Sequence, residues 1–232
     1  MGLKAINWTG GGEPTIYPEF GDLVEFASSL GLEQGLFTNA YQKIPHQEAF
    51  SWIRVSITDT GLDRVVKPTV PFGVVLNQTE QLTFAEMDKM CLKARDIGAS
   101  YFQIRPALTG DFMTQPYLVH PEFLKCRNSD TFKVHVTEYK YAEAQNPKDY
   151  HECYGFNFVP SIDWNGKVSV CLYRTLEKEY ILGDLNKDSF STIWANLPNH
   201  VPAADSCWNC CKNHEINKVL FSAKHIEQGN FL

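Results

Sequence analysis

The sequence predicts an α/β protein in two parts: a layer or partial barrel of parallel strands, followed by a small domain built from a β-hairpin and a helix. In the first half of the chain, short apolar runs alternate with segments of helical periodicity, which indicates parallel strands joined by right-handed crossovers. Beyond residue 150 the chain becomes rich in strand and turn signals, and five of its seven cysteines lie there. We therefore place one domain at residues 1–110, a linker with an extra strand at 111–150 and a second domain at 151–232.

The elements of the first domain follow from apolar runs and their terminators. Residues 3–8 are expected to form a buried strand, because this run ends in glycines. A helix is expected from Pro18 to Leu30, since proline suits a first helical turn and Leu23, Phe26, Ala27 and Leu30 share a face. Further strands are expected at residues 36–38, 53–57, 72–76 and 101–108, with a helix at 84–97; the span from 57 to 72 is too short for a full crossover helix.

Fewer elements are expected after residue 110. One strand is expected at residues 132–139. A hairpin is expected from the runs 156–164 and 167–173, because the Asn165-Gly166 pair between them tolerates positive φ. A short helix at residues 189–195 is expected to bury Phe190, Ile193 and Trp194.

Composition excludes several classes of protein. Hydrophobic residues make up 44% of the 232-residue chain and charged residues 21%, which is an ordinary globular balance. The net charge is −6 and the Lys and Arg residues form no cluster, so direct nucleic-acid binding is not expected. No apolar stretch approaches the roughly 20 residues of a membrane span, and no signal peptide is apparent. We therefore expect a cytoplasmic protein that does not enter a membrane.

The stretch Gly10-Gly11-Gly12-Glu13-Pro14 directly follows the first expected strand. Ligands of open parallel sheets bind beyond the carboxyl ends of the strands, and Pro14 favours an extended conformation at Glu13. Exposed backbone amides beside one carboxylate suit a small ligand that carries both an amine and a carboxylate. For the glycines alone, a tight turn between strand and helix is the alternative interpretation.

This stretch resembles the Gly-Gly-Glu-Pro element of the radical S-adenosylmethionine (radical SAM) enzymes, and the later strands follow in that family's order. The resemblance implies an incomplete parallel (β/α)6-type partial barrel. It places four residues around the methionine ammonium of S-adenosylmethionine: Gly11, Gly12, Glu13 and Pro14. It implies further cofactor contacts from Ser56 and Asn77, although Ser and Asn at strand ends are also ordinary turn formers.

Four cysteines have the spacing of a metal site: Cys153, Cys171, Cys207 and Cys210. The Cys-x-x-Cys pair sets two sulfurs on one turn, and Cys171 at the end of a hairpin strand can meet them. Four thiolates suit either zinc or a [4Fe–4S] cluster, and on spacing alone structural zinc is the commoner occupant. Cys211 competes with Cys210 as the fourth ligand.

The surroundings of these cysteines resemble the auxiliary-cluster domains of radical SAM enzymes, which are called SPASM or twitch domains. The shared order is a cysteine, a hairpin ending in a cysteine, the stretch Leu182-Gly183-Asp184-Leu185, a helix with Trp194, and a Cys-x-x-Cys pair. The two-cluster form needs further cysteines after Cys211, and the sequence has none. The resemblance therefore implies a single auxiliary [4Fe–4S] cluster.

One element of the family pattern is missing from this sequence. The radical-generating cluster of the family is bound by a Cys-x-x-x-Cys-x-x-Cys loop, and that spacing occurs nowhere in the chain. Met1 falls where the family's first helix runs into its second strand. The resemblance thus implies an N-terminally truncated fragment that is inactive by itself.

The function implied by the resemblance is a part in a radical reaction. The family generates a 5′-deoxyadenosyl radical that abstracts hydrogen from a substrate, here an unidentified small molecule or peptide, with an electron donor such as flavodoxin or ferredoxin. Arg54 and Arg105 are candidates to contact a carboxylate of the substrate or the cofactor. Two other functions stay open: a non-catalytic iron–sulfur protein for electron transfer or scaffolding, and a zinc-binding interaction module.

Overall fold

The computed structural model describes residues 3–10, 12–57, 61–78, 82–106, 122–137, 148–203, 207 and 213–224. The chain divides into two compact units, an N-terminal unit (Gly2–Ala142) and a C-terminal unit (Glu143–Leu232), and each is described by itself. No helix among the described residues combines the length and the apolar character that a membrane crossing requires.

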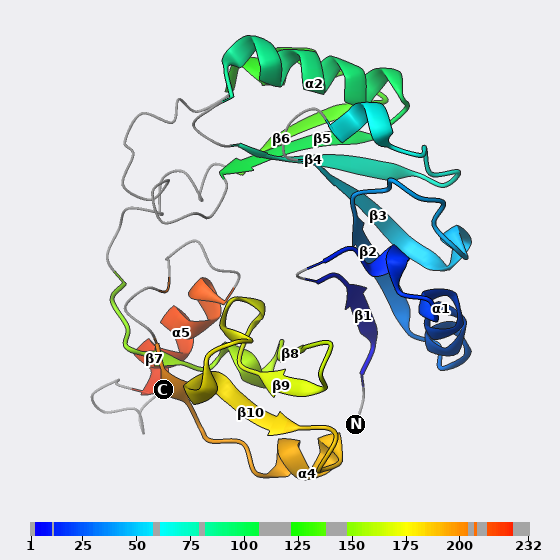
Figure 1. The fold of residues 1–232 in the computed structure, drawn as a ribbon. Helices are drawn as coiled ribbons and strands as arrows, with labels where there is room; N and C mark the ends of the chain where they lie inside the picture. Colours follow the sequence, from blue (N-terminus) through cyan, green and yellow to red (C-terminus); the bar gives the residue numbers. More distant parts are fainter. Residues whose placement is uncertain are drawn as a thin grey trace. The chain divides into compact units, whose positions relative to one another are not determined.

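The N-terminal unit is built on one six-stranded sheet whose strands are all parallel and pair in chain order. Its strands are β1 (Ala5–Trp8), β2 (Glu33–Thr38), β3 (Phe50–Ile57), β4 (Phe72–Gln78), β5 (Tyr101–Pro106) and β6 (Lys133–Val136). Figure 1 shows these strands following one another around a curved sheet, with both long helices of the unit on its outer side. The prediction of an α/β fold with an incomplete parallel barrel is confirmed.

Two α-helices cover the outer side of this sheet: α1 (Phe20–Ser29), which packs on β2, and α2 (Phe84–Asp96), which packs on β5. Short 3-10 helices lie in the connections: η1 (Pro14–Ile16), η2 (Gln47–Ala49), η3 (Gly61–Arg64) and η5 (Glu122–Arg127). As expected from its length, the connection between β3 and β4 holds only η3 among its described residues.

The expected buried face of α1 was wrong. The helix buries Phe20, Val24 and Ala27, whereas Leu23 and Phe26 are exposed. The helix carries two apolar stripes, at i, i+4, i+7 and at i, i+3, i+7. Periodicity alone does not select between such stripes, and packing on β2 selects the first.

Strand alternation divides the sheet into two faces. Ile53, Val55 and Ile57 of β3 point toward the helices and join the hydrophobic core, as do Phe102 and Ile104 of β5. Residues between these positions point the opposite way, toward what we call the inner face. From β3 to β6 the inner face consists of Trp52, Arg54, Ser56, Gly73, Val75, Asn77, Tyr101, Gln103, Arg105, Lys133 and His135.

The described residues of the C-terminal unit form two small antiparallel sheets. β7 (Glu152–Cys153) pairs with β11 (Val201–Pro202), and a three-stranded sheet joins β8 (Ser161–Ile162), β9 (Lys167–Ser169) and β10 (Ile181–Asp184). Its helices are α4 (Phe190–Ala195) and α5 (His214–Lys224), with 3-10 helices η6 (Gly155–Asn157), η7 (Leu172–Arg174) and η8 (Lys178–Tyr180). Of the three side chains expected to be buried in α4, only Ile193 is fully buried; Phe190 and Trp194 are half-buried.

The predicted hairpin is present, but its strands are shorter than expected. Each predicted run contains a 3-10 helix, η6 in the first and η7 in the second, so only β8 and β9 remain paired. The turn between them uses positive φ at Gly166 alone, not at Asn165.

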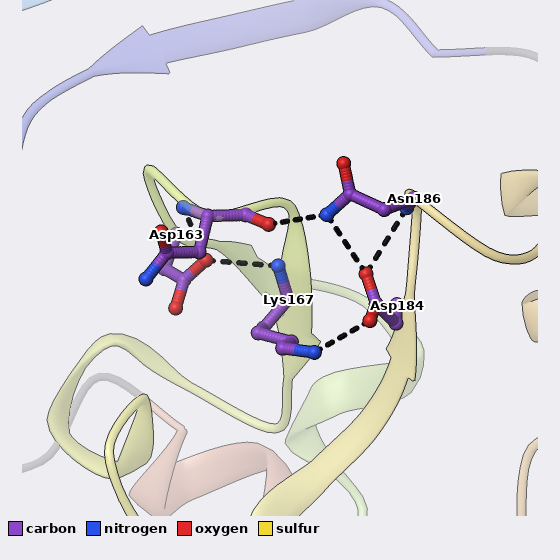
Figure 2. A network of polar contacts seen from close by, with 5 residues as sticks. Asp163, Lys167, Asp184 and Asn186 are labelled. Atoms are coloured by element: carbon purple, nitrogen blue, oxygen red, sulfur yellow. Dashed lines mark hydrogen bonds and ion pairs between the residues drawn. The ribbon is translucent and has the colours of Figure 1, made fainter.

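Polar contacts fix the hairpin turn and its neighbour β10 (Figure 2). Asp163 accepts hydrogen bonds from the backbone amides of Asn165 (2.9 Å) and Lys167 (2.8 Å). The Lys167 Nζ atom lies 2.5 Å from Asp184 Oδ2, and Asn186 donates to Asp184 Oδ1 and to the carbonyl of Asn165. These bonds connect the hairpin to the Leu-Gly-Asp-Leu stretch that the sequence singled out.

Candidate functional site

The first candidate site lies at the carboxyl end of β1, around Glu13. The Glu13 carboxylate reaches across to the end of the neighbouring strand β2, where Oε1 accepts a hydrogen bond from Thr38 Oγ1 (2.6 Å) and Oε2 accepts one from the Asn39 backbone amide (2.6 Å). Oε1 also accepts hydrogen bonds from the amide and the hydroxyl of Thr15 (3.2 and 2.8 Å), so Glu13 is the N-cap of η1. Glu13 thus ties the ends of β1 and β2 together.

These four donors do not occupy every acceptor position of the Glu13 carboxylate. An ionised carboxylate offers about four acceptor positions, shared between its two oxygens. Three of the four donors meet Oε1, and only the Asn39 amide meets Oε2. As far as the described residues go, Oε2 therefore keeps room for one further donor.

The glycines beside Glu13 leave open space. A Cβ atom at Gly12 would meet no atom within 4 Å, and at Gly10 it would make only ordinary contacts. Neither residue has positive φ, so the backbone does not require glycine at these positions. What the missing side chains provide is free access to the backbone. The predicted Gly11 lies outside the described residues.

The loop after β2 is held in an uncommon conformation. Ala40 has φ of 53°, in the left-handed region that only a few per cent of non-glycine residues adopt. Its amide donates to Thr38 Oγ1 (2.9 Å) and its carbonyl accepts from the Val66 amide (2.7 Å). Thr38 and Asn39 were not among the predicted site residues. Thr38 is the last residue of β2 and Asn39 the first residue after it, and this place at the end of the strand that neighbours β1 is the signal that identifies them.

The predicted residues Ser56 and Asn77 are brought together on the inner face. The Asn77 Nδ2 atom lies 3.4 Å from Ser56 Oγ, at the carboxyl ends of the adjacent strands β3 and β4. Arg105 on β5 donates from Nε to Asn77 Oδ1 (2.7 Å). A chain of polar side chains therefore crosses three neighbouring strands at the same edge as Glu13, and the hydrogen bond from Arg105, its register partner on β5, orients Asn77.

The second candidate site is the cysteine cluster of the C-terminal unit. Cys153 lies in β7, Cys171 directly precedes η7, and Cys207 follows β11. Cys210 and its competitor Cys211 lie outside the described residues. Among the residues that the structure does describe, no three His, Cys, Asp or Glu side chains are close enough together to hold a single metal ion.

Each of the three described sulfurs has an N–H donor beside it. Asn217 Nδ2 lies 3.4 Å from Cys153 Sγ, and Arg174 Nη2 lies 3.5 Å from Cys207 Sγ. Burial raises the pKa of the Cys171 thiol, while hydrogen bonds from the backbone of Tyr173 and Arg174 act in the opposite direction. Thiolate is the form of cysteine that binds zinc or iron, and N–H donors of this kind can hydrogen-bond to a metal-bound sulfur. The chemistry of these three side chains fits a thiolate-bound metal centre, although the described sulfurs are not close enough together to hold one metal ion.

Asn217 is a residue that the sequence reasoning missed. It lies on α5, is only 2% exposed, and its Oδ1 accepts from the amides of Tyr154 and Gly155 (2.7 and 3.0 Å). One side chain thus fixes the backbone after Cys153 and donates to its sulfur. The residues that α5 buries, His214 and Asn217, are polar, so apolar periodicity did not reveal this helix.

The other two described cysteines, Cys91 and Cys126, belong to the N-terminal unit. Burial raises the pKa of the Cys91 thiol to about 12, and its side chain belongs to the hydrophobic core of the N-terminal unit. Cys126 is exposed and unpaired with any described cysteine.

Comparison with known proteins finds a family match for the C-terminal unit and structural matches over most of the chain. Residues 153–212 match the SPASM family, an iron–sulfur cluster-binding domain, and this match begins at the first cysteine of the cluster. No curated protein sequence matches the chain significantly.

Solved structures of SuiB from Streptococcus suis share the fold. The crystal structure of SuiB matches with a TM-score of 0.51 and 12% identity, over 79% of this chain and 54% of SuiB. SuiB bound to S-adenosylmethionine gives 0.52 and 13%, over 79% and 53%. SuiB bound to the precursor peptide SuiA gives 0.50 and 12%, over 82% and 53%. The chain spans about half the length of SuiB, and at this identity the likeness concerns the fold.

The comparisons concern the fold of most of the chain and one domain within it. The chain shares the fold of SuiB, and its residues 153–212 match the iron–sulfur cluster-binding SPASM domain that the cysteine spacing and its surroundings led us to expect.

Proposed function

We propose that this protein binds S-adenosylmethionine at the carboxyl edge of its parallel sheet and one [4Fe–4S] cluster in its C-terminal unit, and that it contributes both to a radical reaction on a peptide or small-molecule substrate. The observation that carries the proposal is the Glu13 carboxylate, which is held at the edge by β2 while its Oε2 keeps one acceptor position. The structure of SuiB with bound S-adenosylmethionine supports the choice of ligand.

The residues at this edge match the polar groups of that ligand. Glu13 Oε2 is the acceptor for the ammonium of the methionine part, and the open backbone at Gly12 receives its carboxylate. Asn77 and Ser56 offer amide and hydroxyl groups to the ribose. The strained loop at Ala40 keeps the Asn39 amide in place, so that Glu13 is positioned before the ligand arrives.

When bound beside a reducing iron–sulfur cluster, S-adenosylmethionine supplies hydrogen-atom abstraction from a substrate. The sequence has no Cys-x-x-x-Cys-x-x-Cys spacing for that cluster. We therefore expect the chain as given to bind S-adenosylmethionine without cleaving it. Its own residues orient the cofactor and keep water from it.

For the C-terminal unit, the ligands of the auxiliary cluster are Cys153, Cys171, Cys207 and Cys210. Asn217 and Arg174 donate to two of these sulfurs, and such hydrogen bonds are among the factors that set a cluster's reduction potential. A peptide substrate is supported by the SuiB structure with its precursor peptide, and a flavodoxin or ferredoxin is the proposed electron donor.

Cofactor binding is tested by isothermal titration of the chain with S-adenosylmethionine. We expect Glu13→Gln to weaken binding by about tenfold or more, because an ion pair with the ammonium is lost. The matched control is Glu19→Gln, which removes the same charge from a residue without a side-chain cap bond and leaves the affinity unchanged. Equal affinity of Glu13→Gln and wild type contradicts the assignment, and so does wild-type protein that does not bind.

The metal is tested by anaerobic reconstitution with iron and sulfide. We expect a brown protein with absorbance near 400 nm, roughly as thiolate-bound clusters show, and loss of iron in Cys171→Ala. The control is Cys126→Ala, which removes an exposed thiol outside the proposed cluster site. We expect this variant to bind as much iron as wild type. Zinc in the purified protein and no iron uptake favours the interaction-module alternative. Unchanged iron in Cys171→Ala contradicts the ligand assignment.

A further inference from the structure

The inner face of the sheet has a charge opposite to that of the whole chain. The chain carries a net charge of −6. Along the described strands β3 to β6, however, the inner face holds Arg54, Arg105, Lys133 and His135 and no Asp or Glu. A surface lined by one sign of charge attracts ligands of the other sign. This face therefore favours an anionic ligand.

Arg54 lies within a group of aromatic rings on this face. Its guanidinium carbon is 5.2 Å from the ring centre of Phe37, 5.0 Å from that of Trp52 and 5.9 Å from that of Tyr101. Its Nε donates to the Tyr101 hydroxyl (2.9 Å). Stacking against rings within about 6 Å stabilises a guanidinium without neutralising it. Arg54 is therefore oriented by its neighbours and keeps its charge.

Two glycines make this arrangement possible. Gly35 on β2 lies under the ring of Trp52, and Gly73 on β4 lies under the ring of Tyr101; a Cβ at either position would overlap that ring. Since Gly73 pairs with both Arg54 and Tyr101, the ring reaches Arg54 only across this bare backbone. The sequence places glycine where the rings that hold Arg54 need room.

The outer edge of the Arg54 guanidinium has no ion pair with any described residue. The Nε atom is used by Tyr101, whereas Nη1 and Nη2 meet no described carboxylate, although the side chain is half-buried. A guanidinium presents a planar fork that matches a carboxylate in two parallel hydrogen bonds. A partly buried charge without an acidic partner is destabilising, so packing alone does not explain this arginine.

We propose that Arg54, with Phe37, Trp52 and Tyr101 around it, binds a side-chain carboxylate of an acidic peptide substrate on the inner face. This inference rests on the proposed function, because it names the substrate class of that same barrel. Lys133 pairs with Tyr101 in the sheet register and adds charge beside the site. The substrate segment recognised here contains Glu or Asp residues.

The test uses the full chain and two labelled peptides, hexaglutamate and hexaglutamine with the same fluorescein, followed by fluorescence anisotropy. We expect hexaglutamate to bind and hexaglutamine not to bind. Arg54→Gln weakens hexaglutamate binding by at least about tenfold. The Lys133 side chain is exposed, so we expect Lys133→Gln to fold like wild type and to weaken hexaglutamate binding by a smaller factor. The matched control is Lys89→Gln on α2, outside the inner face, which leaves binding unchanged.

The outcomes separate this inference from the proposed function. Equal binding of both peptides overturns the inference, as does wild-type protein that binds neither, or Arg54→Gln and Lys133→Gln variants that bind hexaglutamate like wild type. Parallel loss of S-adenosylmethionine and hexaglutamate binding in Arg54→Gln also overturns it, because Arg54 then serves the cofactor. If hexaglutamate binds through Arg54 while wild type fails to bind S-adenosylmethionine, the proposed function fails and the anion site stands.

Discussion

Replacing Glu13 by alanine removes a carboxylate that joins two strand ends, and we expect this to destabilise the N-terminal unit even without any ligand. The carboxylate accepts four hydrogen bonds, two of them from Thr15 in the adjacent turn, which water can replace. The other two come from the buried Thr38 hydroxyl and from the Asn39 amide, 26 residues away in the chain. These two bonds are the ones that stabilise the tertiary structure.

The size of the effect follows from those two bonds. A hydrogen bond to a charged group contributes about 1.5–3 kcal/mol net, and partial solvent access at Glu13 lowers that figure. We therefore expect the free energy of unfolding to fall by about 2–4 kcal/mol in Glu13→Ala. With a denaturant slope of about 2 kcal/mol/M in urea, the midpoint moves down by about 1–2 M.

The assay is urea unfolding of the apo protein. Trp8 and Trp52 report on the N-terminal unit, and circular dichroism is recorded in parallel because two units do not guarantee a two-state transition. Glu19→Ala is the control and keeps the wild-type midpoint, since Glu19 makes no side-chain cap bond. A wild-type midpoint in Glu13→Ala would refute the reasoning and reduce Glu13 to a ligand residue.

Two further predictions concern other parts of the structure. Gly73→Ala pushes a methyl group into the ring of Tyr101, so we expect the free energy of unfolding to fall by about 1–3 kcal/mol and hexaglutamate to bind more weakly. The control is Gly12→Ala, which keeps wild-type stability because a Cβ at Gly12 has open space around it. In the C-terminal unit, hydrogen bonds from Lys167 and the Asn186 amide lower the pKa of Asp184 to about 2. A carboxyl group whose pKa is lower in the folded protein than in the unfolded chain stabilises the fold at pH values above its unfolded pKa. We therefore expect wild type to melt at a higher temperature than Lys167→Met at neutral pH, and this difference to disappear as the pH falls from about 4 to 2. A difference that persists at the acid end of this range argues against the pair.

The overall fold was predictable because its signals are local and repeated. Parallel strands buried on the helix side appear as short apolar runs, such as residues 53–57, and each run ends near a glycine or a polar residue. Chain order then equals strand order, since right-handed crossovers place each new strand beside the last. The motif Gly-Gly-Glu-Pro and the cysteine spacing added the two sites.

What the sequence did not reveal depends on tertiary contacts. The face that α1 buries is decided by β2, because Phe26 and Val24 are equally apolar but only Val24 meets the sheet. The hairpin strands are shortened because Cys171 and Phe156 are held by 3-10 turns around the cysteine cluster. Asn217 was missed because a buried polar residue has no periodic signature, and its value lies in partners more than sixty residues away.

The double use of Glu13 determines how its variants must be interpreted. A loss of cofactor affinity in Glu13→Ala would not distinguish a missing ion pair from a displaced Asn39 amide, because the same carboxylate supports both. Glu13→Gln retains an oxygen that accepts from Thr38 but presents an amide where Oε2 met the Asn39 amide. Comparing the two variants in both assays separates the roles: a positioning role predicts that affinity falls in proportion to stability, whereas direct contact with the ammonium predicts that Glu13→Gln loses far more affinity than its change in stability explains.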